Sequence, residues 1–241
     1  MNETLVIIPA YNEEKSIGHI VRGIKDEFSH LDVVVIDDGS IDRTKETAKA
    51  SGAKVLSHAY NLGYGVALQT GYKYFQKHPE YNYLVQLDGD GQHNFKDIPC
   101  LLEPLRQNRA EIVIGSRFLS EKNSFRIPIV RHIGILFFRF LIRILTGTKI
   151  KDITSGLQAC DRSVVQTYLS DEFPYYYPDV NVLFIHLKKG FSIEEIPSAM
   201  LENREGKSMH KGWGRQLYYV LAMILSILVI LFKNLGRRHA Q

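Results

Sequence analysis

Short apolar runs alternate with helix-forming segments through the first half of the chain, and this alternation restricts the fold more than any other feature. The runs predict strands at Leu5–Pro9, Val33–Asp37, Lys54–Ser57, Tyr83–Asp88 and Ile112–Ser116. The segments between them predict helices at Ser16–Phe28, Thr44–Ala50, Gly65–Gln76 and Asp97–Gln107. Strands connected through helices are typical of a mainly parallel sheet with helices packed on it. We therefore expect an α/β fold.

Polar side chains follow four of these strands, at the point where each strand ends. These groups are Tyr11-Asn12-Glu13, Asp37-Asp38-Gly39-Ser40, Asp88-Gly89-Asp90 and Arg117. Open α/β sheets bind their ligands at the carboxyl ends of the strands. The four groups are therefore expected to line a single crevice.

Asp88 and Asp90 are the strongest candidates for chemistry, because they follow an apolar strand and are separated by Gly89, which allows a turn. Mg²⁺ and Mn²⁺ prefer oxygen ligands and commonly bridge a few carboxylates to substrate phosphates. Gln92 offers one more oxygen. An Asp-x-Asp pair taken alone is more often a polar turn, so the metal site depends on the neighbouring groups.

The other polar groups also have two interpretations each. Asp37 and Asp38 can accept hydrogen bonds from a base or a ribose, or can belong to a capped turn before Thr44. Arg117 and Arg131 can grip phosphate oxygens in a bidentate fork. Taken singly, each arginine is more often a solvated or structural cation.

Charge is divided unevenly along the chain. Residues 1–120 contain 13 Lys+Arg and 16 Asp+Glu, a net of −3, whereas residues 121–241 contain 17 and 10, a net of +7. The basic half suits nucleic acid, anionic lipid or phosphorylated small molecules. Its basic residues accompany long aliphatic runs instead of alternating with aromatic ones, so we expect no nucleic-acid partner.

The segment 129–145 is strongly apolar but carries His132, Arg139 and Arg143, at spacings of 7 and 4 residues. On a helix these three residues fall within about 40° of each other. We expect an amphipathic helix that lies in the membrane interface, with its basic stripe meeting anionic lipid. The alternative is a core helix with three solvated cations.

The tail contains a second apolar segment, Leu217–Phe232, which has 16 residues without a charge. As a helix it covers about 24 Å, slightly less than a hydrocarbon core of about 30 Å. Extension over 213–235 completes a single membrane span, which we favour over a helix lying on the membrane or at an oligomer interface. We therefore divide the chain into a catalytic domain, 1–210, and a membrane-anchoring helix, 211–241.

Two features indicate the compartment. Cys100 and Cys160 are too few for a disulfide framework. The chain enters its first apolar run at Leu5 without a basic leader, a long apolar region or a cleavage site. We expect a protein of the cell membrane whose catalytic domain lies in the cytoplasm.

Five motifs together resemble family 2 glycosyltransferases, in the order seen in that family. They are Pro9-Ala10-Tyr11-Asn12-Glu13-Glu14, Asp37-Asp38-Gly39-Ser40, Asn61-Leu62-Gly63-Tyr64-Gly65, Asp88-Gly89-Asp90-Gly91-Gln92-His93 and Gly115-Ser116-Arg117-Phe118. Within this family, the chain resembles the dolichyl-phosphate mannosyltransferase branch and its bacterial polyprenyl-phosphate relatives. The similarity continues through Arg131, 152–156 and 204–208, and covers about residues 4 to 210.

This resemblance implies a GT-A fold and a role for each matching residue. It places the nucleotide-sugar against Pro9, Tyr11, Glu13, Asp38, Asp88 and Gln92. It assigns Mg²⁺ or Mn²⁺ to Asp88, Asp90 and Gln92, and catalysis to Asp90, Arg117 and Arg131. It assigns the acceptor phosphate to Arg117, Arg131, Arg204 and Lys207. One departure is the tail, because several relatives carry two or four clear transmembrane helices.

The expected activity is inverting transfer of a hexose, from GDP-mannose or a UDP-sugar to a polyprenyl or dolichyl phosphate at the cytoplasmic membrane face. A homo-oligomer or a small membrane-protein partner remains open. Two alternatives are a glycosyltransferase with a different acceptor and a catalytically silent membrane-binding subunit. A sugar-phosphate nucleotidyltransferase is less suitable, because Ala10-Tyr11-Asn12-Glu13 stands where such enzymes carry a Gly-rich basic loop.

Overall fold

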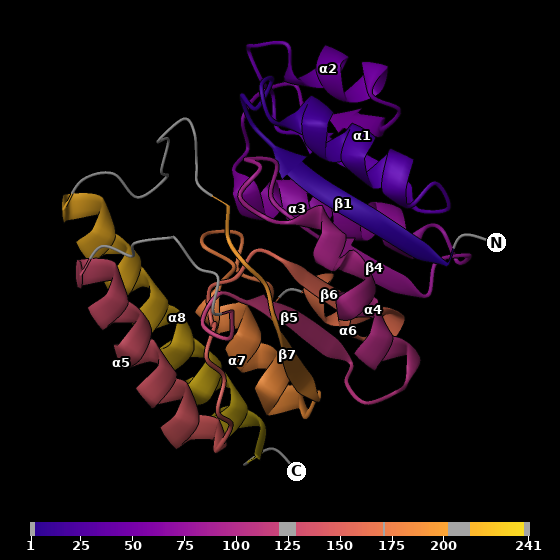
Figure 1. Cartoon of the computed structure of the whole chain (residues 1–241). Coiled ribbons are helices and arrows are strands. Elements are labelled where there is room, and N and C mark those ends of the chain that lie inside the picture. Colours follow the sequence, from indigo (N-terminus) through magenta and orange to yellow (C-terminus); the bar gives the residue numbers. More distant parts are fainter. Residues whose placement is uncertain (1–2, 121–128, 171, 202–212, 239–241) are drawn as a thin grey trace.

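The computed structural model describes residues 3–120, 129–170, 172–201 and 213–238. These residues form one sheet of seven strands in the order β3-β2-β1-β4-β6-β5-β7 (Figure 1). The strands are β1 (Thr4–Ala10), β2 (Asp32–Asp37), β3 (Lys54–Ser57), β4 (Tyr83–Gln86), β5 (Ile112–Ser116), β6 (Gln158–Asp161) and β7 (Ile193–Pro197). Neighbouring strands are parallel, except that β6 runs antiparallel to both β4 and β5. The expected mixed, mainly parallel sheet is confirmed.

The helices are α1 (Ile17–Glu27), α2 (Thr44–Ala50), α3 (Tyr64–Gln76), α4 (Ile98–Arg106), α5 (Ile129–Thr146), α6 (Arg162–Tyr168), α7 (Val180–Lys189) and α8 (Trp213–Arg238), with a 3-10 turn at Phe95–Asp97. The five predicted strands and four predicted helices are all present, with ends that differ by at most two residues. Strand β4 ends at Gln86, although the Leu87 and Gly89 amides still donate to the carbonyls of Ile7 and Pro9. The backbone therefore follows β1 as far as the Asp88 region.

Two hydrophobic cores lie on opposite faces of the sheet, because consecutive strand residues point to opposite sides. Leu5 and Ile7 of β1 pack with α3 and α5 to α8 on one face. Val6 and Ile8 pack with α1, α2 and α4 on the other. Strands covered on both faces appear in the sequence as continuous apolar runs, which is why these strands could be predicted.

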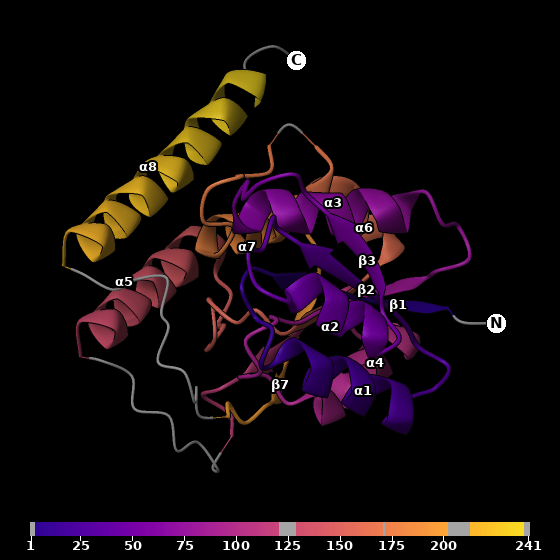
Figure 2. The same ribbon diagram turned by 90° about the horizontal axis from the view of Figure 1, so that it is seen from above.

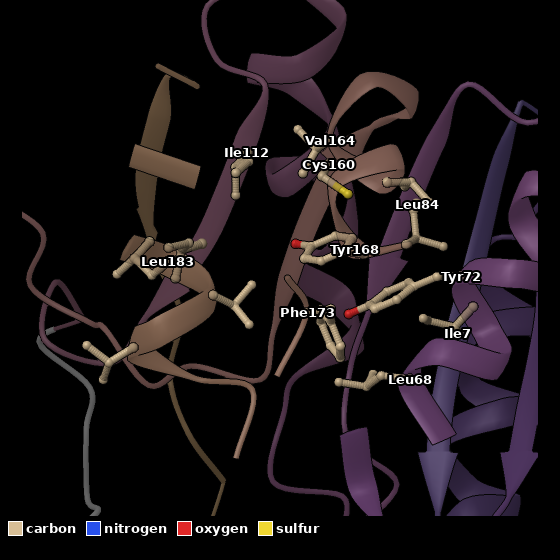
Figure 3. Packing of buried hydrophobic residues seen from close by; sticks show 14 of the residues in the cluster. Ile7, Leu68, Tyr72, Leu84, Ile112, Cys160, Val164, Tyr168, Phe173 and Leu183 are labelled. Atoms are coloured by element: carbon tan, nitrogen blue, oxygen red, sulfur yellow. The ribbon is translucent and has the colours of Figure 1, made fainter. Parts of the chain in front are cut away.

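Aromatic rings fill the centre of the first core. Tyr72 of α3 stacks on Tyr168 of α6, with 4.3 Å between ring centroids, and Phe173 meets both rings edge-on (Figure 3). The Tyr72 hydroxyl donates to Gln86 of β4 over 2.6 Å, so the buried polar group has a partner. This packing fixes α3, and with it the residues at its N-terminal end.

Helices α5 and α8 lie on the same flank of the molecule, and both contact α7 (Figures 1 and 2). Ile135, Phe138 and Ile142 of α5 and Met223 and Ile227 of α8 are buried. Another set of apolar side chains on these helices is exposed, namely Ile133, Leu136, Phe137, Phe140 and Ile144 of α5 and Leu221, Leu225, Leu228, Val229 and Phe232 of α8.

Within the described part of the chain, no helix is long and apolar enough to cross a membrane. The single span expected over 213–235 is therefore not found. Helix α8 instead docks on the domain, where Asn181 of α7 donates to Ser226 over 3.1 Å and the Tyr219 hydroxyl donates to Asp179 over 3.1 Å.

Candidate active site

The paired acids stand where β4 runs past the end of β1. Asp88 is held on both sides of its carboxylate: the Tyr64 hydroxyl donates to Oδ1 over 2.8 Å, and His93 Nε2 lies 3.2 Å from Oδ2. Tyr64 opens α3 and His93 follows the acidic turn, so two segments fix one side chain. Asp90 Oδ1 accepts a hydrogen bond from the backbone amide of Gln92 over 2.9 Å. The turn thus presents two oriented carboxylates.

The pKa values of the two carboxyl groups are shifted in opposite directions. Burial raises the pKa of Asp88, but hydrogen bonds from His93 and Tyr64, with the electrostatic effect of His93 and of Arg117, more than offset it, so the pKa lies below its ordinary value. Burial and the negative charge of Asp88 raise the pKa of Asp90. A divalent cation between them would offset the burial and the repulsion.

A metal ion would find few ligands here besides these acids. The described residues hold no group of three or more His, Cys, Asp or Glu side chains suited to a metal. The expected metal ligands are the carboxylates of Asp88 and Asp90 and the side-chain amide oxygen of Gln92, which is half-buried. Hard cations often bind through one or two carboxylates plus substrate phosphates, so this oxygen set fits Mg²⁺ or Mn²⁺.

Gly156 allows the Asp88 carboxylate its position. A Cβ at residue 156 would lie 2.8 Å from Cγ and 2.9 Å from Oδ1 of Asp88, and closer still to Oδ2. The backbone before β6 therefore closes directly against the acid, and no side chain fits between them.

The same loop holds Arg117. Asp152 accepts from the Arg117 Nε over 2.7 Å and from Nη2 over 2.6 Å, and Thr154 accepts from Nη2 over 2.7 Å. Both partners of this ion pair are buried. Burial alone lowers the pKa of Arg117, but Asp152 reverses the shift and keeps the guanidinium charged. Arg117 is thus a fixed cation within electrostatic range of Asp88.

Asp38, at the end of β2, is also held by its own chain. Its Oδ1 lies 2.6 Å from His58 Nδ1 and accepts from the Leu62 amide over 2.9 Å, while Oδ2 accepts from the Gly63 amide over 2.8 Å. At Gly39, φ is +69° and a Cβ would lie 2.6 Å from the Tyr60 Cα. The Asp38 turn and the loop before α3 are therefore packed together.

Two loops beside this turn are joined by hydrogen bonds. The Asn12 amide donates to Ser40 Oγ over 3.0 Å, and the Glu13 amide donates to Thr44 Oγ1 over 2.7 Å. Ser16 Oγ donates to the Gly89 carbonyl over 2.6 Å and so ties these loops to the acidic turn. Tyr11 stays 44% exposed at the rim. The arrangement forms a polar edge that faces solvent.

The predicted site residues fall into three groups. Pro9, Asp88, Asp90 and Gln92 come together, because Gly89 bonds to the Pro9 carbonyl; Arg117 lies across the Asp152–Gly156 loop. Tyr11, Glu13 and Asp38 line the β1–β2 side.

The remaining predicted residues fall outside the described part. Arg204 and Lys207 lie outside the described residues, as does the side chain of Arg131. The Leu201 amide, just before the undescribed segment 202–212, donates to the Gln92 carbonyl over 2.8 Å.

Sequence reasoning missed the residues that orient these groups. Tyr64, His93, Asp152 and Gly156 all stand inside the quoted motifs, but their roles as partners of Asp88 and Arg117 depend on contacts between distant segments. The signal that could have indicated them is the length of the motifs, which include residues beyond those expected to contact substrate.

Comparison with protein families gives one match that covers most of the chain. Residues 5–169 match the family model described as glycosyl transferase family 2. The chain belongs to this family. It is accordingly a glycosyltransferase, and its seven-stranded sheet has the GT-A arrangement of such enzymes.

Named relatives belong to the branch expected from the motifs. The chain is 29% identical to a UDP-N-acetylglucosamine–dolichyl-phosphate N-acetylglucosaminyltransferase of Methanococcus voltae, covering 91% of this chain and 94% of the relative. It is 31% identical to an undecaprenyl-phosphate mannosyltransferase of Micrococcus luteus, over 86% and 87%. It is 30% identical to a polyprenol monophosphomannose synthase of Mycolicibacterium smegmatis, over 87% and 81%.

Solved structures share the fold at lower identity. Glucosyl-3-phosphoglycerate synthase of Mycobacterium tuberculosis, in complex with Mn²⁺ and UDP-glucose, has a TM-score of 0.70 and 22% identity. The match covers 94% of this chain and 79% of that one.

Proposed function

We propose that this glycosyltransferase transfers a hexose from a nucleotide-sugar to the phosphate of a polyprenyl lipid, with inversion at the anomeric carbon. The observation that carries the proposal is the acidic turn Asp88–Asp90, oriented by Tyr64 and His93 and separated from the fixed cation Arg117 by one loop. Relatives named for a dolichyl-phosphate and an undecaprenyl-phosphate acceptor support it. These relatives are named for different sugars, so GDP-mannose and UDP-sugars are both candidate donors.

The donor half uses the residues on the β1, β2 and β4 side. Pro9, Tyr11, Glu13 and Asp38 surround the nucleotide, and Asp88, Asp90 and Gln92 would hold Mg²⁺ or Mn²⁺. When bound, such a cation supplies Lewis-acid stabilisation of the departing diphosphate. The fold neighbour bound to Mn²⁺ and UDP-glucose is consistent with this chemistry.

The acceptor half needs to bind an anion and does not need a general base. A phosphate monoester has a second pKa of about 6, so most of the acceptor is doubly ionised near neutral pH and is already nucleophilic. Arg117, Arg131, Arg204 and Lys207 hold that phosphate and offset its repulsion from the donor diphosphate. Direct attack on the anomeric carbon breaks its bond to the diphosphate and inverts its configuration.

The exposed apolar side chains of α5 and α8 support attachment of the protein to a membrane. Phe140 and Ile144 of α5 are 64% and 63% exposed, and Phe232 of α8 is 68% exposed. An amphipathic helix buries such side chains at the boundary between headgroups and acyl chains. We place this flank on the cytoplasmic face of the cell membrane, next to the acceptor.

The test is a panel of radiolabelled donors with undecaprenyl phosphate and Mg²⁺ or Mn²⁺. Wild-type protein should transfer one hexose to the lipid, and Asp90→Ala should lose that transfer by about a hundredfold or more. Asp26→Asn, an exposed acid on α1, is the matched control and should retain it.

Three outcomes would decide against parts of the proposal. Full metal-dependent transfer by Asp90→Ala would remove the central assignment. Transfer to 3-phosphoglycerate but not to the lipid would favour a soluble acceptor. The absence of turnover with every donor would favour a catalytically silent subunit.

A further inference from the structure

Arg139 on α5 departs from the basic stripe expected on that helix. His132 and Arg143 are exposed, as a solvated or headgroup-facing stripe requires, but Arg139 is only partly accessible. Its Nε and Nη2 atoms are buried and have no hydrogen-bond partner among the residues that the structure describes. The stripe prediction is therefore wrong for this residue.

The Arg139 side chain reaches the end of β5. Its guanidinium carbon lies 3.8 Å from the centroid of the Phe118 ring, and the guanidinium carbon of Arg117 lies 5.9 Å from the same centroid. Two guanidinium groups from different elements thus share one aromatic ring. Burial lowers the pKa of Arg139; Asp152 and Glu195 oppose this shift, and the positive charge of Arg117 adds to it.

Two carboxylates act on Arg139, but both are bonded to other donors. Asp152 accepts from the side chain and amide of Arg117. Glu195 accepts from the amides of Lys151 and Asp152, each over 2.7 Å. A buried charged donor without a partner is costly, more so than a neutral one. The position is therefore suited to an anion that comes from outside the chain.

We propose that Arg139 binds the phosphate of the acceptor lipid together with Arg117, a role that rests on the proposed function. The shared chemistry is a phosphate oxyanion, which both the acceptor and the donor carry. The acceptor is favoured because α5 also bears the exposed apolar side chains Phe137 and Phe140, beside which a polyprenyl chain can lie. One helix then contacts both ends of an amphiphilic substrate.

The experiment measures steady-state transfer to undecaprenyl phosphate in neutral-detergent micelles, so that binding to a membrane does not enter. Arg139→Gln should raise the KM for the acceptor about ten- to a hundredfold and leave the KM for the nucleotide-sugar within about twofold, as expected for loss of a charge-assisted hydrogen bond. The acceptor KM of Arg139→Lys should fall between those of the wild-type protein and Arg139→Gln. Lys188→Gln, which removes a cation 5.9 Å from the Phe184 ring, is the matched control.

A structural role predicts different results. Because Nε and Nη2 of Arg139 have no hydrogen-bond partner among the described residues, Arg139→Gln should keep or raise the thermal midpoint, whereas loss of a structural cation lowers it. Calorimetric titration with farnesyl phosphate and with farnesol separates phosphate from chain, and only the phosphate should lose affinity. An unchanged acceptor KM, an equal rise in donor KM, or a lowered midpoint overturns the proposal. Failure of the wild-type protein to transfer to lipid phosphate overturns the proposed function instead.

Discussion

Replacing Gly156 with alanine puts a methyl group where the Asp88 carboxylate stands. The new carbon would lie 2.8 Å from the Asp88 Cγ, whereas carbon atoms in contact prefer about 3.5 to 4.0 Å. Asp88 must therefore move by about 1 Å. The neighbouring backbone cannot share this movement easily, because Ser155 Oγ is bonded to the Gly115 carbonyl over 2.7 Å.

The displacement has a cost in stability and a larger one in activity. Moving Asp88 weakens its hydrogen bonds with Tyr64 and His93, and bonds to charged groups contribute about 1.5 to 3 kcal/mol each. Alanine recovers about 0.4 to 1 kcal/mol by restricting the unfolded chain. We expect a net loss of about 1 to 4 kcal/mol in the free energy of unfolding. A misplacement of about 1 Å can lower turnover about a hundredfold.

The assay compares Gly156→Ala with Gly134→Ala, because a Cβ at Gly134 meets no atom within 4 Å. Turnover of nucleotide-sugar and urea unfolding are measured for both variants. Gly134→Ala should keep its activity and gain a few tenths of a kcal/mol to about 1 kcal/mol in its helix. If Gly156→Ala turns over as fast as Gly134→Ala, the contact between this loop and Asp88 does not constrain the acid, and the reasoning fails.

Two further predictions concern stability. Arg117→Met should lower the free energy of unfolding by about 3 to 5 kcal/mol, since it leaves Asp152 buried and unpaired; adding Asp152→Leu should recover much of this in urea unfolding. Burial, with a smaller contribution from Lys189, lowers the pKa of His186 to about 3, so the unfolded chain binds the proton more readily. Stability should therefore be full above about pH 6.5 and fall by up to about 1.4 kcal/mol per unit as the pH drops toward 3. His186→Gln should flatten that slope, and an unchanged slope would assign it to other groups.

Apart from β3, which buries no residue, the strands that could be predicted differ physically from those that could not. β1 and β2 are buried on both faces, so their sequences are continuous apolar runs. β6 buries only Ala159 and Cys160 and carries polar residues at both ends, and β7 buries only Ile196. Their place in the sheet depends on pairing with β4 and β5, which local patterns do not encode.

The candidate site divides in a similar way. The position of Asp88 and Asp90 just after a strand could be predicted from the apolar run before them, whereas their role as metal ligands stays a prediction. Arg139 was misplaced because helical periodicity gives the angle of a side chain but not what its long stem reaches, here Phe118. The orienting partners of Asp88 were also beyond local patterns, since Tyr64 and His93 meet it only in the folded chain.

The loop before β6 has a consequence for protein engineering. Asp152 fixes an arginine assigned to the acceptor, and four residues later Gly156 bounds an acid assigned to the donor. An experiment that exchanges donor halves between relatives must therefore keep this loop compatible with both the acceptor arginine and the donor acid. Nucleotide specificity is better altered from the Asp38 side, where the loops bond to each other and leave the acceptor arginine untouched.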